Sequence, residues 1–492
     1  MATVNTNDLR IKNAKNLIDS FNDQSNLGLG TTANGYVFVG RVQPWDDDNL
    51  PPPPQNNFRE FYTTYDDMLA LSRIDVNDAY HMIPKRKWAS SVIYDRYQHN
   101  YTLENRSYTG ANNLYDCAFF VINSLNNVYI CLDNNSNSPS TVEPNVTGNN
   151  SFYTSDGYQW LRLFDISNSD LQTKSTNNLM PIAVSNANSS QKDGQVYTVI
   201  INNGGSGYTV NPSGVVNQVT EYYAHINGDG TGAVAKVTIG SSTISKVEVV
   251  RGGSGYTFAT LEFTSGNVYQ TLGDLDLSIN GLNPLGDRNL VTTVIISPPG
   301  GWGSDLIRQM GGTRVGVFSS LDYSLFRDNF PCPFRQIGIL QDFTYSGTNP
   351  NSLQACYAIN TDGVATGNSF MIGETIEQTI ILSDGVTKKA KGTVVAYDTT
   401  NGVIRYVQGS SDVDADGELY TFQGRGQISG RSSARAAVVN HDNVTVSDTT
   451  FTNGYANPEL TKYTGYMTYL TNFSPVVRDA QQSERLSLVI AF

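Results

Sequence analysis

The hexapeptide Gly-Gly-Ser-Gly-Tyr-Thr occurs twice in this chain of 492 residues, at 204–209 and, 48 residues later, at 252–257. Segments typical of strands, VYTVIINN and ISKVEVVR, precede the two copies. A glycine-rich loop that binds phosphate must lead directly into a helix whose N-terminus faces the phosphate. Pro212 follows the first copy, and Tyr256-Thr257-Phe258 favours a strand in the second. We therefore predict strand–turn–strand elements, in which glycines adopt positive φ and the tyrosine packs over the turn.

Composition extends the β prediction to the whole chain. Only 16% of the residues are charged, whereas Gly (44) and Tyr (28) are abundant, and this mixture favours strands joined by tight turns. We predict a mainly β, multi-domain protein, with a β-sandwich framework, a few short helices and inserted β modules. The predicted segments are an N-terminal framework (1–185), an inserted β region with both hexapeptides (186–300), a return to the framework (301–360), a small inserted β module (361–445) and C-terminal framework strands (446–492).

Individual elements can also be placed. A helix is predicted in NDLRIKNAKNLIDSFN (7–22), with an apolar stripe that would contain Leu9, Ala14, Leu17, Ile18 and Phe21. A buried strand is expected at 36–39 and a second helix at 58–74. Four prolines at 51–54 predict an extended surface arm that is either a stiff connector or a docking segment. Asn401-Gly402 marks a hairpin turn, and the alternation in SERLSLVIAF predicts a C-terminal strand.

Charge and cysteine content restrict the partners. The net charge is −13 and no long basic run exists, so a nucleic-acid partner is not expected. The densest basic cluster, Lys85-Arg86-Lys87, is interpreted as an ion-paired loop. No apolar run approaches the roughly 18 residues that span a bilayer. The four scattered cysteines (Cys117, Cys131, Cys332 and Cys356) and the lack of a signal peptide favour a protein of the reducing cytoplasm.

No motif predicts catalysis or a cofactor. The histidines (His81, His99, His225 and His441) have no metal-ligand spacing, and Ser304-Asp305 is interpreted as the N-cap of a short helix at 306–310. In DVDADGELYTFQ, Asp412, Asp414 and Asp416 match the first half of a calcium loop, but Gln423 stands at the twelfth position. An acidic β-turn is the preferred interpretation, and bound calcium is the alternative.

Several segments together resemble one known family, the smaller β-rich baseplate wedge protein of T-even-like contractile-tailed phages. Each segment has a counterpart in the family, in the same order along the chain. They are VFVGRVQPW (37–45), MIPKRKW (82–88), YICLD (129–133), DGYQWLRLFDI (156–166), FRQIGIL (334–340), and GYMTYLTNFSP with LSLVIAF in the last thirty residues. The two segments predicted as inserted β modules have no counterpart, and they resemble modules in structural proteins of large cyanobacterial phages.

The resemblance implies a non-catalytic, dimeric protein that contacts other wedge proteins in the virion tail baseplate and is assembled in the host cytoplasm. Neither a small-molecule substrate nor a membrane is expected. The candidate framework or partner-contact residues are Arg41, Pro44, Trp45, Pro84, Arg86, Trp88, Trp160 and Arg335. A tail-fibre or receptor-binding protein that recognises host surface glycan is the alternative, and a glycan-degrading tail enzyme with paired carboxylates is a third interpretation.

Overall fold

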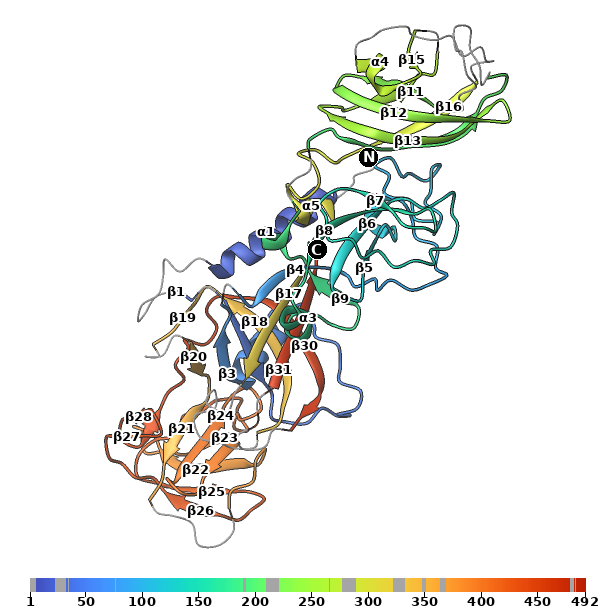
Figure 1. Cartoon of the computed structure of the whole chain (residues 1–492). Coiled ribbons are helices and arrows are strands. Elements are labelled where there is room, and N and C mark those ends of the chain that lie inside the picture. Colours follow the sequence, from blue (N-terminus) through green and yellow to red (C-terminus); the bar gives the residue numbers. More distant parts are fainter. Residues whose placement is uncertain are drawn as a thin grey trace. The chain divides into compact units, whose positions relative to one another are not determined.

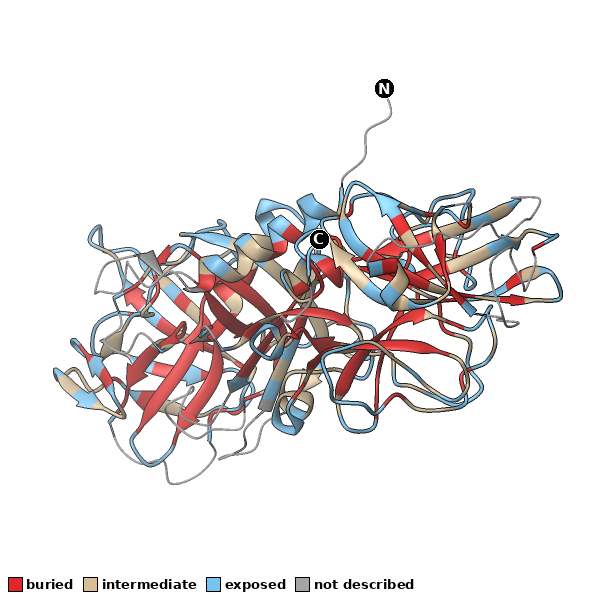
Figure 2. Cartoon of the chain, turned by 45° about the horizontal axis from the view of Figure 1, so that its top comes forward, coloured by how far each residue is buried: buried red, intermediate tan, exposed pale blue. Residues whose placement is uncertain are grey.

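The computed structural model describes residues 6–22, 32–33, 35–75, 77–188, 192–208, 221–264, 266–276, 289–321, 332–346, 351–362, 369–477, 482 and 484–492. The chain divides into two compact units. Unit 1 contains Met1–Ala14, His81–Arg314 and Ala491–Phe492, and unit 2 contains Lys15–Tyr80 and Val315–Ile490. The fold is mainly β, with several antiparallel sheets and few short helices (Figure 1), which confirms the predicted fold class. Buried residues gather along the strands, whereas many connecting loops are exposed (Figure 2).

Unit 1 is built on the sheet β5-β6-β8-β7, in which Cys131 of β6 faces Trp160 of β8. Its strands outside the repeat region are β4 (Ala79–Pro84), β5 (Phe120–Ile122), β6 (Asn127–Asp133), β7 (Phe152–Tyr153), β8 (Gln159–Asp165) and β9 (Leu179–Pro181). The helical segments are α1 (Asn7–Asn22, which continues into unit 2), η1 (Leu114–Asp116), α3 (Asn168–Thr173), η2 (Val184–Asn186), α4 (Leu272–Asp276) and α5 (Leu306–Gln309). Asp305 caps α5 by accepting from the Arg308 N–H at 3.1 Å, in agreement with the predicted N-cap.

The repeat region of unit 1 is a pair of reciprocally packed repeats. The Tyr208 N–H donates to the Ser242 carbonyl at 3.0 Å, and the Tyr256 N–H donates to the Gly194 carbonyl at 3.2 Å. Both donors and both acceptors are separated by the 48 residues that separate the hexapeptides. The two repeats are therefore related by a local pseudo-two-fold, and the turn of each closes on the other. Their strands are β10 (Val196–Gly204), β11 (Glu221–Gly228), β12 (Thr231–Gly240), β13 (Thr243–Ser254), β14 (Ala259–Leu261), β15 (Val268–Tyr269) and β16 (Leu290–Ile296).

The hexapeptide glycines behave as predicted. Gly205 and Gly253, the second glycine of each copy, have φ of 65° and 61°. A Cβ on either one would come within 3 Å of the tyrosine ring of the same copy. Both tyrosines, Tyr208 and Tyr256, are buried. The turn in the second copy joins β13 to β14, whereas residues 209–220, which follow Tyr208, lie outside the described part of the chain.

Unit 2 contains two sheets that share a core. The five-stranded sheet β20-β3-β2-β18-β30 and the seven-stranded sheet β26-β25-β22-β23-β24-β21-β29 meet where Val39 and Val42 pack with Val395 and Val407. The first sheet and its surroundings contain β1 (Thr32–Ala33), β2 (Tyr36–Gly40), α2 (Phe58–Asp67), β3 (Met68–Arg73), β17 (Arg314–Leu321), β18 (Phe334–Gln341), β19 (Phe343–Thr344), β20 (Ser352–Gln354), β30 (Tyr466–Val476) and β31 (Glu484–Ala491). The second sheet and the ribbon β27-β28 contain β21 (Tyr357–Asn360), β22 (Thr375–Ile381), β23 (Thr387–Asp398), β24 (Val403–Val407), β25 (Gln427–Gly430), β26 (Ala436–Val438), β27 (Val444–Val446), β28 (Thr449–Phe451) and β29 (Tyr455–Ala456).

Two predictions about helices differ from the structure. The second helix ends at Asp67, and residues 68–73 form strand β3, because this apolar run pairs with the fully buried β2 instead of continuing the helix. In α1, Ile11 is buried and Leu9 is 48% exposed, so the buried stripe begins two residues later than predicted. The buried strand at 36–39, the Asn401-Gly402 turn between β23 and β24, and the C-terminal strand β31 are confirmed.

Candidate partner-contact residues

Arg41 and Trp45 form one contact in unit 2. The Arg41 guanidinium carbon lies 3.8 Å from the centre of the Trp45 ring, and its Nη1 is 3.3 Å from the Asp67 carboxylate. Arg41 adopts a left-handed φ of 61°, where its backbone N–H donates to the Asp67 carbonyl at 2.9 Å. Pro44, whose carbonyl accepts from Arg41 at 3.5 Å, is exposed. The block Gly-Arg-x-x-Pro-Trp thus folds into a turn that is held by its own arginine.

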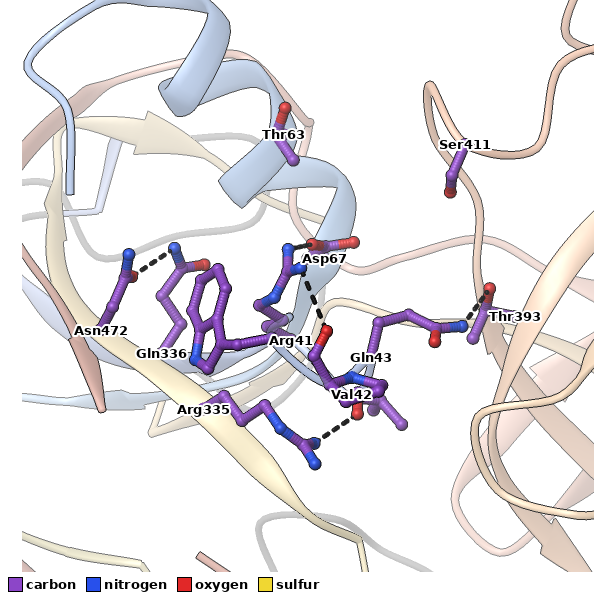
Figure 3. A network of polar contacts seen from close by, with 12 residues as sticks. Arg41, Val42, Gln43, Thr63, Asp67, Arg335, Gln336, Thr393, Ser411 and Asn472 are labelled. Carbon is purple, nitrogen blue, oxygen red and sulfur yellow. Dashed lines mark hydrogen bonds and ion pairs between the residues drawn. The ribbon is translucent and has the colours of Figure 1, made fainter. Parts of the chain in front are cut away.

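Arg335 holds the same turn from β18. Its Nε and Nη2 donate to the two oxygens of Asp48 at 2.8 and 2.7 Å. Its Nη1 donates to the Val42 carbonyl, as Figure 3 shows. The hydrogen bond from Arg335 is the main cause that lowers the pKa of Asp48 to about 2. Arg335 is itself buried, so it acts here as a framework residue that ties two distant segments together.

Gln43 reaches the seven-stranded sheet from the same turn. Its Nε2 donates to the Thr393 hydroxyl of β23 at 3.1 Å and to the Gly373 carbonyl at 3.0 Å (Figure 3). On the other side, Gln336 of β18 donates to Asn472 of β30 at 2.9 Å. The turn 41–48 is therefore a junction between the two sheets of unit 2. The sequence marked Arg41, Pro44 and Trp45 as candidates only through the family resemblance, and it did not predict this junction.

Two candidates of unit 1, Arg86 and Trp88, lie beside β5, the edge strand of the sheet β5-β6-β8-β7. The Arg86 guanidinium lies 4.6 Å from the centre of the Phe120 ring, and its Nη2 donates to the Asp116 carbonyl at 3.5 Å. Trp88 donates through Nε1 to the Ser140 hydroxyl at 3.1 Å. Pro84 ends β4 opposite Leu179 of β9. All three candidates are half-buried and contribute to internal packing.

Trp160 lies entirely inside unit 1. Its ring stacks on Tyr158 at 5.4 Å and 16°, and Tyr94 meets it edge-on at 5.9 Å. Since no part of this side chain is exposed, Trp160 packs the sheet and does not reach the surface of unit 1.

The basic cluster was predicted incorrectly as an ion-paired loop. Within the described ranges, no ion pair joins Lys85, Arg86 or Lys87 to a carboxylate. Lys85 donates to the Ser175 hydroxyl at 3.2 Å, and the Lys87 backbone bridges Ile122. The Arg86 guanidinium instead packs against the Phe120 ring, and burial lowers the pKa of Arg86.

The acidic turn at 412–417 holds a lysine. Lys388 Nζ lies 2.9 Å from Asp414 and 2.8 Å from Asp416. Asp412 turns away from them and accepts from the Gly409 N–H at 3.0 Å. The three carboxylates therefore do not converge as a calcium loop requires, and the described residues contain no group of three or more His, Cys, Asp or Glu arranged to hold a metal ion.

A buried group of charges was missed by sequence reasoning. Asp66 and Asp67 end α2, and Lys462 lies 3.8 Å from Asp66. Burial raises the pKa of Asp67 to about 6 and lowers that of Lys462. Because these residues are almost 400 positions apart in the chain, no motif or spacing announces their contact.

Comparisons with known proteins identify no family for this chain. Neither a scan against models of protein families nor a search of curated proteins found a match. In the described part of the chain, no helix has the length and apolar character needed to cross a membrane. All four cysteines are buried as thiols.

Proposed function

We propose that this chain is a structural subunit of the baseplate wedge of a contractile phage tail. The observation that carries the proposal is the series of segments that resemble this family in the same order along the chain. In unit 2, three of these segments supply β2, β18 and β30, which are neighbours in one sheet. In unit 1, two of them supply β6 and β8, which are paired. Such adjacency supports a common framework in which the segments depend on one another.

In this role the chain links neighbouring wedge proteins and takes part in baseplate assembly and in its rearrangement at infection. We propose that it acts as a homodimer in the virion, after assembly in the cytoplasm of a cyanobacterial host, without nucleic acid, membrane, cofactor or small-molecule substrate. The packing of the candidate residues supports a mechanical role, because Arg41, Arg335 and Gln43 tie strands together. Among the candidates, Pro44 is the exposed residue that is best placed for a partner contact.

The native mass of the purified chain tests this proposal. We expect a dimer whose mass stays constant when the concentration is varied, measured by sedimentation or light scattering. A trimer would contradict the proposal and favour the alternative, a tail-fibre or receptor-binding protein, because fibres are usually trimeric. Turnover of host polysaccharide would likewise contradict a structural role. Mixing the dimer with candidate wedge proteins of the same phage then identifies the partner. Pro44→Ala, compared with Pro298→Ala, tests whether the exposed turn contacts that partner.

A further inference from the structure

Three carboxylates of unit 2, two from a helix end and one from a loop, share one buried site. Asp66 and Asp67 come from the end of α2, and Asp412 comes from the loop that follows β24 of the seven-stranded sheet. Asp66 and Asp412 are 8% and 5% exposed, and the Asp67 side chain is 19% exposed. Three carboxyl groups with so little exposure to water are costly to ionise unless each is paired with a cation or accepts hydrogen bonds.

The loop of the seven-stranded sheet is packed directly on the helix end. A Cβ on Gly409 would lie 2.5 Å from the Cβ of Asp66. Asp66 also accepts a hydrogen bond from the Ser410 backbone, and Asp412 accepts from the Gly409 N–H at 3.0 Å. Any separation of the two sheets at this loop must therefore expose the carboxylates to water.

Cations and phenols face the carboxylates from the other elements packed against them. Arg41, which follows β2, pairs with Asp67, and Lys462, which precedes β30, is 3.8 Å from Asp66. Tyr463 donates its hydroxyl to Asp66, and the Tyr357 ring of β21 is 5.0 Å from the Lys462 ammonium. Among the described residues, the titratable or charged groups that bear on the site include Arg41, Tyr65, Asp66, Asp67, Cys356, Tyr357, Lys391, Asp412, Lys462 and Tyr463.

We propose that this group is a proton-dependent latch, which holds the loop 409–412 of the seven-stranded sheet on the end of α2 more firmly in mild acid than at neutral pH. Protonation of one carboxylate removes a buried negative charge and the repulsion between neighbouring acids. Opening of the loop returns the carboxylates to water, where they ionise readily at neutral pH. The latch goes beyond the proposed baseplate role and does not depend on it.

The sign follows from the burial. Burial raises the pKa of all three carboxyls, to about 6 for Asp67. A raised carboxyl pKa means that the closed state binds more protons than the open state between the ordinary pKa near 4 and the raised one. The closed loop therefore loses stability as the pH rises through this window, and it regains stability as the pH falls. Between pH 5 and pH 7 the closing equilibrium should change about tenfold for a shift of this size.

Hydrogen exchange of the full chain, read by mass spectrometry, tests the latch. We expect the peptides that cover 405–414 and 460–466 to be about tenfold better protected at pH 5 than at pH 7, after correction for the intrinsic rates. Peptides of β6 and β8 in unit 1 provide the internal reference, because no residue of the latch lies there. Equal corrected protection at the two pH values would overturn the proposal.

Two substitutions separate the latch from general acid effects. Asp67→Asn and, independently, Asp412→Asn keep the side-chain shape. Asp67→Asn should remove most of the pH dependence of the 405–414 peptide, and Asp412→Asn, which takes away a neighbouring negative charge, should reduce it. Asp416→Asn is the matched control, since Asp416 lies in the same loop with a 71% exposed side chain and pairs with Lys388. That control should keep the tenfold change. If Asp416→Asn removed it, or if both buried variants retained it, the assignment to this group would be wrong.

Discussion

At the scale of single residues, two arginine–carboxylate ion pairs hold the turn 41–48 of unit 2 in place. Arg335 of β18 reaches Asp48, 287 positions away, and Arg41 reaches Asp67. Each guanidinium also donates to a backbone carbonyl of the turn 41–48. The planar fork of arginine makes such simultaneous contacts, which lysine cannot reproduce. At these two positions a lysine therefore cannot replace the arginine, although both residues carry a positive charge.

We predict that Arg335→Lys destabilises unit 2 by roughly 2 kcal/mol, because a lysine keeps one contact to Asp48 or Val42 and leaves the other group unpaired in a buried place. Thermal unfolding measures the change, and a decrease of several degrees in the midpoint is expected. The matched control is Arg431→Lys, since Arg431 pairs with Glu377 through a side chain that is 63% exposed. Equal effects of the two substitutions would show that the turn does not depend on the fork.

The sequence indicated some of these residues as candidates, but it did not predict which residues they contact. Arg41, Trp45 and Arg335 were selected because they carry the family resemblance, and their contacts in one junction follow only from the pairing of β2 with β18. Gln43, Asp66 and Lys462 gave no signal at all, because a single glutamine or lysine in a polar chain has no distinctive spacing. Local chemistry was predictable here, and long-range pairing was not.

At the scale of elements, the turn chemistry was the most predictable part of the fold. Glycine at positive φ in the hexapeptides and Asn401-Gly402 in the β23–β24 hairpin required only local rules. Residues 68–73 escaped those rules, because their apolar run suits a helix and a buried strand equally well and pairing with β2 decided the outcome. The reciprocal packing of the repeats also escaped, since identical turns predict similar structures but not how two copies meet.

The first glycine of each hexapeptide lies where the two repeats pack against each other. A Cβ on Gly204 would lie 2.5 Å from the Ile244 carbonyl oxygen, at the start of β13. A Cβ on Gly252 would lie 2.6 Å from the Val196 carbonyl oxygen, at the start of β10. Each glycine therefore permits close approach to the backbone of the other repeat, where a methyl group finds no space.

We predict that Gly252→Ala destabilises the repeat region by roughly 2 kcal/mol, through overpacking against backbone atoms that cannot move cheaply. Its distinctive result is faster hydrogen exchange in β10, although the substitution lies 48 residues further along the chain. Gly204→Ala should produce the same effect at the start of β13. Gly273→Ala in α4 is the control, because its Cβ would meet only the Thr271 hydroxyl at 3.8 Å. Exchange that changes only beside the substituted residue would contradict the reciprocal arrangement.

At the scale of the whole molecule, the repeat region meets the rest of unit 1 through the ribbon of β10 and β16. Tyr197 and Ile295 on this ribbon belong to the core that contains Trp302 and Leu161. Val199 and Val294 belong to the core of the repeats. The ribbon thus has one face in each core. Ile201 and Thr292 are cross-strand neighbours in it, so the chain enters and leaves the rest of the repeat region at almost the same point.

This arrangement predicts that the repeat region can be removed without loss of the remaining fold. Replacing residues 202–291 by Asn-Gly joins two cross-strand neighbours through the turn that closes a two-residue hairpin most readily. The ribbon positions that the deletion uncovers are made polar together by Val196→Thr, Val199→Thr, Val294→Thr and Ile296→Thr. We expect this shortened chain to keep the native oligomeric state of the full chain and the exchange protection of β6 and β8.

A longer deletion provides the contrast. Removing 196–296 with the same Asn-Gly link also takes away Tyr197 and Ile295, and it leaves Trp302 and Leu161 without their cover. Loss of two large buried side chains costs several kcal/mol, of the order of the whole stability of a domain, so this chain should lose the protection of β6 and β8. If both deletions unfolded unit 1, the repeats would be integral to the framework. If both left it intact, the ribbon would have no part in the core, and the packing of Tyr197 and Ile295 would contribute little to stability.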